Sequence, residues 1–446
     1  MVIEKERALW DTMRADSLNP SQGDVPPGYK KTEVGVIPED WDIQSLEHIT
    51  DPNRSIRYGI VQVGPFTNNG ISVLAIKNLN TNYIDNVHRS SLEIEKAYAK
   101  SRVHSGDILI SVKGTTGRIG IVPKHFEGNI SRDLARLSLT EKDIPEFWFQ
   151  MLQSEDARQR LNLATVGTTR MEISIGILKQ IIMARPPLPE QRAIAAALSD
   201  ADGLIGALDA LLEKKRGIKQ AAMQQLLTGK KRLPGFEEEW DIKRLGEVGE
   251  ISGAGVDKKS RPSEQPVRLV NYLDVYRRDF IYSRDLNHWV TAPTHQVSRC
   301  SVQLGDVFFT PSSETRDDIG VSAVAMEDIP NAVYSYHVVR LRLRDDWDLR
   351  FRTYAFKTRE FLKQAETLCD GSGTRYVVSQ NKFESMTVRV PPLPEQTAIA
   401  AVLSDMDAEI AALESRREKA QQIKRGMMQQ LLTGRIRLVD PPEAAA

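Results

Sequence analysis

The chain has 446 residues, 41% of them hydrophobic and 27% charged, which is typical of a globular protein long enough for two or three domains. It contains no run of 18 apolar residues, no apolar segment near its start, and only two cysteines. We therefore expect a cytoplasmic protein with no membrane span, secretory signal, disulfide framework or cysteine zinc site. Lysine plus arginine equals aspartate plus glutamate at 60 each, so any DNA-binding face needs local positive charge.

Residues 1–28 are interpreted as an N-terminal extension, and residues 29–185 as a first domain of mixed helix and sheet. Short β-rich runs at 107–112 and 119–122 predict strands. The segment 145–162 predicts a helix.

Two polar loops of this domain are candidates for ligand contact. The first is Lys113–Arg118, where glycines let the backbone approach a ligand and the side chains can meet phosphates or base edges. The second begins at Gly167. The candidate residues are Lys113, Thr115, Thr116, Arg118, Thr168, Thr169 and Arg170. The alternative for any single loop is an ordinary hairpin turn.

Residues 186–233 predict a long helix. It begins with Pro186-Pro187-Leu188-Pro189-Glu190-Gln191, where proline suits the first turn and the glutamate faces the positive end of the helix dipole. Apolar residues follow at spacings of four and three, as in a coiled-coil seam. They are Ile194, Leu198, Ala201, Ile205, Leu208 and Leu212, and after a lapse at Lys215 the pattern resumes with Ile218, Ala222 and Leu226. Gly229 is a natural end for this helix.

Residues 234–390 predict a second mixed domain that loosely echoes the first. Strands are expected at 307–310 and 338–343, and a helix at 348–366. Two loops correspond to those of the first domain. Their candidate residues are Ser312, Ser313, Thr315, Arg316, Ser372, Thr374, Arg375 and Tyr376. The segments 129–132 and 335–337 are weaker candidates, and His337 alone is interpreted as a structural histidine.

Residues 391–437 repeat the long helix. The sequence PPLPEQTAIAAVLSDMD at 391–407 matches PPLPEQRAIAAALSDAD at 186–202, and MQQLLTG occurs at both 223–229 and 428–434. The offset is 205 throughout, so this is a duplicated two-part unit rather than a solenoid. The seam repeats as Ile399, Leu403, Met406, Ile410 and Leu413, lapses at Arg417, and resumes with Ile423, Met427 and Leu431. Residues 438–446 are interpreted as a flexible tail.

The duplication predicts an α+β protein with two recognition domains separated by two long helices. Paired antiparallel as a coiled coil, the helices would relate the domains by a pseudo-twofold axis. Each helix would be about 58 Å long, against a B-DNA repeat of about 34 Å, and could act as a ruler. The alternatives are two unrelated amphipathic helices packed on their own domains, or polyproline ligands at the PPLP segments.

Signatures of DNA-acting enzymes are missing from the sequence. It has no nucleotide-binding P-loop, no G-x-G-x-x-G after a strand, and no Asn/Asp-Pro-Pro-aromatic methyltransferase motif. Its seven histidines and two cysteines form no H-x-x-x-H or C-x-x-C. These absences favour a non-catalytic binding subunit whose chemistry lies in other chains.

The order of elements resembles the specificity subunit of type I restriction–modification systems. The resemblance rests on the opening GYKKTEVGVIPEDW at 28–41, the two PPLPEQ segments and the two QQLLTG endings. It implies two target recognition domains that each read one half of a bipartite, asymmetric site in double-stranded DNA, with the helices setting the spacer. It also implies partners: two modification subunits that carry S-adenosylmethionine and dock on the helix faces away from the seam, and restriction subunits that use ATP and Mg²⁺. No cofactor is expected in this chain.

Two other functions stay open on the sequence alone. A coiled-coil scaffold could join proteins without reading DNA. A stand-alone nuclease is the third possibility, and cleavage by the purified chain would support it.

Overall fold

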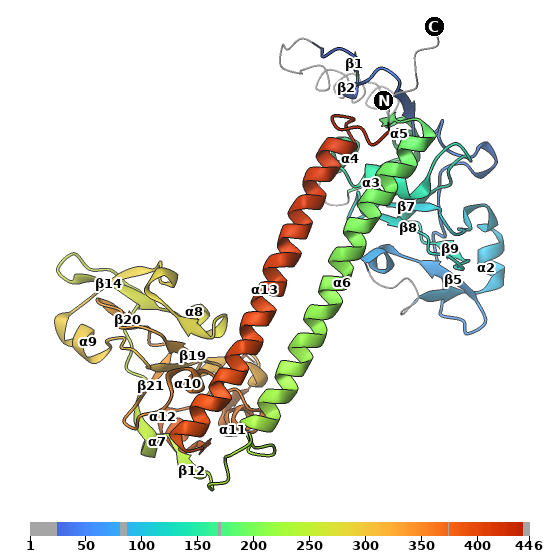
Figure 1. Ribbon diagram of the computed structural model, residues 1–446. Coiled ribbons are helices and arrows are strands. Elements are labelled where there is room, and N and C mark those ends of the chain that lie inside the picture. Colours follow the sequence, from blue (N-terminus) through green and yellow to red (C-terminus); the bar gives the residue numbers. More distant parts are fainter. Residues whose placement is uncertain (1–24, 81–86, 168–170, 373, 440–446) are drawn as a thin grey trace. The chain divides into compact units, whose positions relative to one another are not determined.

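The computed structural model describes residues 25–80, 87–167, 171–372 and 374–439. The chain forms two compact units, residues 1–208 with 416–446, and residues 209–415. Helices α6 (Leu188–Leu226) and α13 (Leu393–Leu431) each contribute to both units (Figure 1). Each unit combines mixed sheets with helices, which confirms the predicted fold class.

The first unit is built on a four-stranded antiparallel sheet in the order β4-β10-β7-β8 and a three-stranded sheet in the order β6-β5-β9. Its strands are β1 (Tyr29–Thr32), β2 (Gly35–Pro38), β3 (Asp42–Ser45), β4 (Arg57–Tyr58), β5 (Ile71–Leu74), β6 (His88–Ser90), β7 (Ile108–Ser111), β8 (Ile119–Ile121), β9 (Asn129–Ile130), β10 (Leu134–Leu137) and β11 (Ile182–Arg185). Its short helices are α2 (Leu92–Lys96), α3 (Pro145–Leu152), α4 (Glu155–Leu163) and α5 (Ile175–Gln180).

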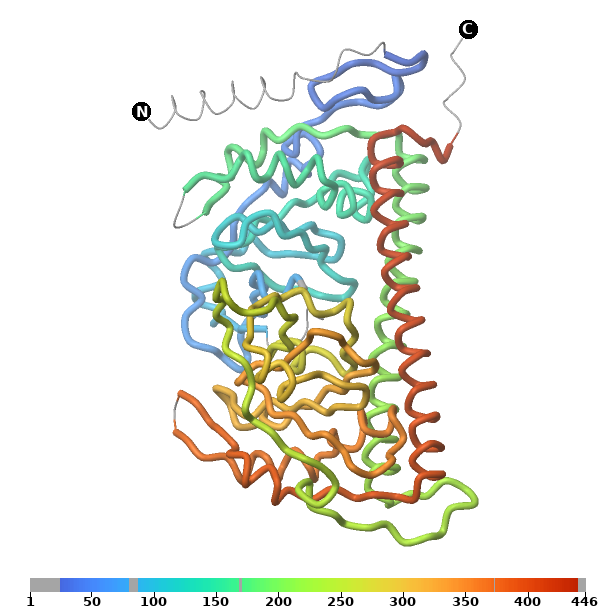
Figure 2. Tube along the Cα trace, turned by 90° about the vertical axis from the view of Figure 1, so that its left-hand side faces the viewer, coloured from blue at the N-terminus to red at the C-terminus, as the bar shows by residue number. Residues whose placement is uncertain are grey.

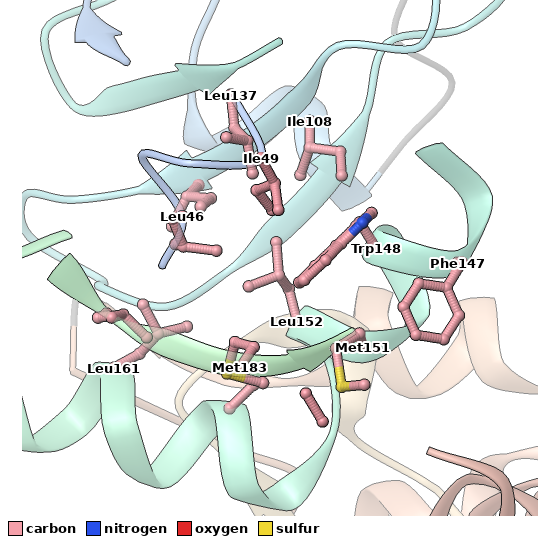
Figure 3. Packing of buried hydrophobic residues seen from close by; sticks show 14 of the residues in the cluster. Leu46, Ile49, Ile108, Leu137, Phe147, Trp148, Met151, Leu152, Leu161 and Met183 are labelled. Carbon is pink, nitrogen blue, oxygen red and sulfur yellow. The ribbon is translucent and has the colours of Figure 1, made fainter. Parts of the chain in front are cut away.

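The core of this unit lies between the four-stranded sheet and the helices that follow it. Figure 3 shows Ile108 and Leu137 of the sheet together with Trp148 and Leu152 of α3 and Met183 of β11. All five are buried. Removal of these side chains from water is the main favourable term that holds the sheet and helices together.

The second unit has a five-stranded sheet in the order β13-β21-β17-β19-β15 and two three-stranded sheets, β16-β14-β20 and β18-β23-β22. Its strands are β12 (Asp241–Arg244), β13 (Gly249–Ser252), β14 (Gln265–Val270), β15 (Phe280–Ile281), β16 (Trp289–Ala292), β17 (Val307–Phe309), β18 (Ser312–Ser313), β19 (Ser322–Ala325), β20 (Ala332–Tyr334), β21 (Val339–Leu343), β22 (Asp370–Ser372), β23 (Arg375–Val377) and β24 (Thr387–Val390). Its short helices are α7 (Leu245–Val248), α8 (Tyr272–Tyr276), α9 (Thr294–Arg299), α10 (Leu349–Ala355), α11 (Arg359–Leu368) and α12 (Gln380–Ser385).

The two units share their strand pairings. The pair β3–β11 corresponds to β12–β24, and β10-β7-β8 corresponds to β21-β17-β19. The register also matches, since Arg136 lies opposite Leu109 and Arg340 lies opposite Phe308. The weak sequence similarity between the two halves therefore corresponds to a shared arrangement of strands.

The prediction of one helix in each domain is wrong in one respect, because each predicted helix is divided into two helices in the structure. The segment 145–162 breaks after α3, where the Ser154 hydroxyl accepts a hydrogen bond from the backbone N–H of Ala157 and caps α4. The segment 348–366 breaks after α10, where Thr358 caps α11 through the N–H of Phe361. Serine and threonine at such positions start a new helix by binding its free N–H groups.

The long helices begin two residues after Pro186 and Pro391, and they end three residues before Gly229 and Gly434. Gly229 and Gly434 both have a φ of 70°, the left-handed conformation that ends a helix. No helix in the described ranges is long and apolar enough to cross a membrane.

Within each unit, α6 and α13 run antiparallel and side by side (Figures 1 and 2). In the second unit Lys215 pairs with Glu409 at 2.6 Å, and Lys219, one turn later, pairs with Asp407. In the first unit Lys424 pairs with Asp202 at 2.6 Å. These pairs hold the helices in a defined register.

The seam is buried at the start of each long helix and again at Leu226 and Leu431, as predicted, but not at Ile218 and Ile423, where it was expected to resume. Ile194, Leu198, Ile399 and Leu403 are buried, whereas Ile218 and Ile423 are 46% and 53% exposed. The reason lies in their neighbours, because Lys219 and Lys424 turn inward to bind the facing aspartates. Ion pairs replace apolar packing at this level of the seam.

The glutamate of each PPLPEQ segment is completely or almost completely buried, at 0% exposure for Glu190 and 1% for Glu395. Glu190 accepts hydrogen bonds from Nε1 of Trp41 at 2.7 Å and from Nε of Arg437 at 2.6 Å. The dipole interaction predicted for these glutamates is therefore only part of their role.

Glu395 makes the same contacts in the second unit. It accepts from Nε1 of Trp240 at 2.7 Å and from Nε of Arg232 at 2.6 Å. The hydrogen bond and the charge of Glu395 raise the pKa of Arg232. Each glutamate thus joins the start of one long helix to the end of the other and to the first strand region of the domain.

The glutamine that follows bridges the same joint. Gln191 accepts from the N–H of Ile144 at 3.0 Å and donates to the carbonyl of Pro186 at 2.9 Å. Gln396 accepts from the N–H of Asp348 and donates to the carbonyl of Pro391. The repeated Glu-Gln pair therefore attaches each domain to its helix.

Replacing Glu395 by glutamine keeps an acceptor for Trp240 but removes the charge that pairs with Arg232. Because Arg232 would lose its buried partner, we expect the free energy of unfolding of the second unit to fall by about 3 kcal/mol. Urea unfolding of the full chain, followed by tryptophan fluorescence, measures this loss. Glu237→Gln, an exposed glutamate in the same connecting segment, is the control and should change stability by less than about 0.5 kcal/mol. Equal effects of the two substitutions would contradict the role of the buried pair.

Candidate nucleic-acid interface

Four segments of the first domain meet at one end of its four-stranded sheet. The N–H of Val112 donates to the carbonyl of Asp133 at 2.8 Å, and the N–H of Ile173 donates to the carbonyl of Val112 at 2.8 Å. The N–H of Arg132 donates to the carbonyl of Ile60 at 2.9 Å. We call residues 57–62, 112–118, 131–133 and 171–173 the first loop cluster.

Lys113 lies at the centre of the first loop cluster. Its Nζ pairs with Glu172 at 2.9 Å and lies 5.8 Å from the centre of the Tyr58 ring. The Tyr58 side chain is 48% exposed. This arrangement presents a cation and an aromatic face beside each other, which suits contact with a phosphate or a base.

The other predicted residues of this loop differ in their surroundings. Thr115 and Arg118 are exposed, and the backbone N–H of Arg118 donates to the hydroxyl of Ser111 at 2.7 Å, which fixes the loop. Thr116 exchanges a hydrogen bond with Thr165 at 3.3 Å. Thr168, Thr169 and Arg170 lie outside the described residues.

The second domain brings the corresponding segments together. Ser312 pairs with Val377, and Ser313 with Tyr376, in strands β18 and β23. The N–H of Tyr336 donates to the carbonyl of Val256 at 3.3 Å. We call residues 255–258, 311–318, 335–338 and 370–377 the second loop cluster, without Gly373, which is not described.

Arg375 connects three parts of the second loop cluster. Its Nη2 donates to the hydroxyl of Ser312 at 3.0 Å and lies 3.5 Å from Nδ1 of His337. Ser312 is buried and serves as an anchor, whereas Arg375 itself is exposed. A guanidinium held at one nitrogen has its remaining donors available for a planar acceptor edge.

The remaining predicted residues lie around this arginine. The Arg316 guanidinium lies 4.8 Å from the centre of the Tyr376 ring, and the Thr315 hydroxyl donates to Asp318 at 2.8 Å. Burial raises the pKa of Tyr272, against the effect of its hydrogen bond with Ser313. Ser372 and Thr374 are exposed.

The structure adds Tyr58 to the sequence-based candidates and shows the surroundings of the weaker candidate segment 335–337. Tyr58 was missed, because a tyrosine in a two-residue strand carries no distinguishing pattern. Tyr336 is 50% exposed and its ring lies 3.9 Å from that of His337, so His337 belongs to an exposed cluster rather than to the core.

The two loop clusters contain hydrogen-bond donors, acceptors and aromatic faces. Across the described part of the chain, no three His, Cys, Asp or Glu side chains are grouped so that they could hold a metal ion. The clusters can recognise a polar, planar and negatively charged ligand by hydrogen bonds and stacking.

Comparison with known proteins agrees with this reading. Residues 46–214 and 237–425 match the family model described as the type I restriction modification DNA specificity domain. The chain is 25% identical over 444 residues to a putative type I restriction enzyme specificity subunit, MjaX, of Methanocaldococcus jannaschii, covering 92% of this chain and 97% of that one. It is 29% identical over 211 residues to the EcoBI specificity subunit of Escherichia coli, covering 45% of this chain and 44% of that one.

Solved structures share the fold. A chain from a study of complex assembly in a type I restriction–modification system superposes with a TM-score of 0.56 at 18% identity, covering 90% of this chain and 99% of that one. The S subunit of M. genitalium gives a TM-score of 0.52 at 16% identity, covering 88% and 96%. With two copies of the family domain spanning most of its length, the chain belongs to the type I restriction–modification DNA specificity family.

Proposed function

We propose that this chain is the DNA-sequence-specificity subunit of a type I restriction–modification complex, with two recognition domains at 29–185 and 234–390. Each domain reads one half of a bipartite, asymmetric site in double-stranded DNA. The observation that carries the proposal is that both domains form a loop cluster on the same strand frame but fill it with different side chains.

The difference between the clusters supports an asymmetric target. At corresponding positions after β7 and β17, the first domain has Lys113 paired with Glu172, and the second has Ser312 anchoring Arg375. Because the two domains share a backbone arrangement, these side chains occupy corresponding positions. Their different chemistry then selects different base edges. We assign base and phosphate contacts to the exposed polar residues of both clusters, among them Arg118, Arg316 and Arg375.

The helices are assigned two roles in the complex. Each of the two is 39 residues long, and we infer that they set the unread spacer between the half-sites. Their faces away from the seam dock two modification subunits, which supply S-adenosylmethionine and adenine methylation. Leu204, Leu211 and Ile218 lie exposed on α6 at intervals of seven residues, which favours a protein partner there. Restriction subunits, with ATP and Mg²⁺, complete the complex.

A binding series tests the function itself. The chain, in complex with its modification subunits, is tested for binding to two kinds of duplex at several salt concentrations. One kind carries the sequence that is methylated in cells, and the other has a random sequence. We expect a preference for the target of at least about 10³-fold. A scaffold protein without DNA reading would show no sequence preference.

Arg375→Ala should weaken discrimination at one half-site. Loss of a bidentate arginine contact to a base costs about 1–3 kcal/mol, so the preference for the correct base should fall by about 5- to 150-fold while the other half-site is unchanged. Competition between duplexes with single base changes measures this preference. The control is Arg389→Ala, a half-buried arginine on β24 that pairs with Glu360. If the base preferences of Arg375→Ala match those of the parent complex, our site assignment is wrong.

Arg118→Ala should lower affinity without changing the sequence that is read. A phosphate contact contributes uniformly to all sequences, so the slope of log affinity against log salt should decrease in magnitude by about one. Titration from low to high salt with target and random duplexes gives the slope. Arg158→Ala, an exposed arginine on α4, should leave it unaltered. A change confined to the target duplex would instead indicate a base contact.

Lengthening both helices should lengthen the spacer. Seven residues inserted at facing positions near Lys215 of α6 and Glu409 of α13 preserve the seam and add about 10 Å. We expect the half-sites to stay the same and the spacer to grow by about three base pairs, at about 3.4 Å each. Mapping of methylated adenines in cells that carry each variant measures both. An unaltered spacer would refute the role of the helices as a ruler.

A further inference from the structure

One short turn occurs at the same place in both loop clusters with different residues. It joins β9 to β10 in the first domain and β20 to β21 in the second. Ser131 forms a parallel bridge with Ile60, and Ser335 forms the same bridge with Val256. After the shared serine, the first domain has Arg132-Asp133 and the second has Tyr336-His337.

The backbone at this turn packs closely against a neighbouring segment in both domains. A Cβ at Gly59 would lie 1.7 Å from the carbonyl oxygen of Ile130, and a Cβ at Gly255 would lie 2.2 Å from the carbonyl carbon of Ser335. Only glycine permits so close an approach of the neighbouring segment. Close backbone packing beside the turn in both domains gives a similar frame for two different pairs of side chains.

Those side chains project outward and are half exposed. The exposed fractions are 51% for Arg132, 42% for Asp133 and 50% for Tyr336. An exposed tyrosine ring beside a histidine ring, tilted by 39° to it, offers an aromatic face on which a base can pack. The turn therefore lies open to a ligand on a closely packed backbone.

The surroundings of His337 determine which of its ring nitrogens can donate a hydrogen bond. Burial, together with the charges of Lys258 and Arg375, lowers its pKa, which favours the neutral imidazole at pH 7. Its Nδ1 faces Nη2 of Arg375 at 3.5 Å, so Nδ1 acts as the acceptor and Nε2 carries the proton. His337 and Arg375 then present donors in the same place.

We propose that the turns 131–133 and 335–337 are specificity-determining elements that contact base edges, one in each half-site. The inference rests on the proposed function and extends it to the chemistry of the bases. In the second domain the donors of His337 and Arg375 fit the acceptor edge of guanine, with Tyr336 packing on the neighbouring base. In the first domain the carboxylate of Asp133 fits the amino group of cytosine or adenine.

An exchange of turns tests the proposal. The double substitution Tyr336→Arg with His337→Asp places the residues of the first domain on the frame of the second. The full chain, in complex with the modification subunits, is presented with duplexes randomised at both half-sites, and the bound sequences are determined. We expect a change of about tenfold or more in base preference at one or two positions of one half-site. The other half-site and the spacer should not change.

If the variant with the exchanged turn does not fold, single substitutions at His337 test the proposal instead. His337→Ala should lose preference for guanine at one position, and His337→Gln, which retains a donor, should recover part of it. His295→Ala is the matched control, an exposed histidine on α9 outside the second loop cluster.

The outcomes separate this inference from the proposed function. If the parent complex reads its target but His337→Ala and the exchange leave every base preference within about twofold, the turns are not specificity elements. If the parent complex itself shows no sequence preference, the proposed function fails and the inference fails with it. A change in both half-sites would also overturn it.

Discussion

A buried glutamate at the start of each long helix constrains the structure around it. A carboxylate removed from water must be paired and hydrogen-bonded, since its desolvation otherwise costs several kcal/mol. Glu190 and Glu395 each meet this requirement with a tryptophan and an arginine. The tryptophan comes from the segment that leads into the domain, and the arginine from the segment that follows the other helix. One side chain thereby positions three parts of the chain.

This arrangement explains why each unit uses both helices. In the second unit the arginine is Arg232, which follows α6, while the glutamate begins α13. In the first unit Arg437 follows α13, while Glu190 begins α6. Each joint therefore needs the end of one helix and the beginning of the other, and the antiparallel ion pairs between the helices agree with it.

The frame and the loops have separate physical requirements. The joints, the strand register and the close approach at Gly59 and Gly255 tolerate little change, because buried charges and backbone contacts leave no space for it. The loop clusters carry exposed side chains whose replacement costs the fold little. A protein that must keep its architecture while reading different sequences benefits from this separation.

The sequence by itself determined the features that depend on local pattern. The 205-residue repeat, the two long helices with their proline starts and glycine ends, the mixed domains and the loop at 113–118 all follow from patterns in the sequence. Only the tertiary structure decided the contacts between distant residues. The pairing of Glu190 with Arg437, the inward turn of Lys219 that leaves Ile218 exposed, and the meeting of Arg375 with His337 join residues far apart in sequence. Local periodicity carries no information about such partners, because they are selected by how the whole chain packs.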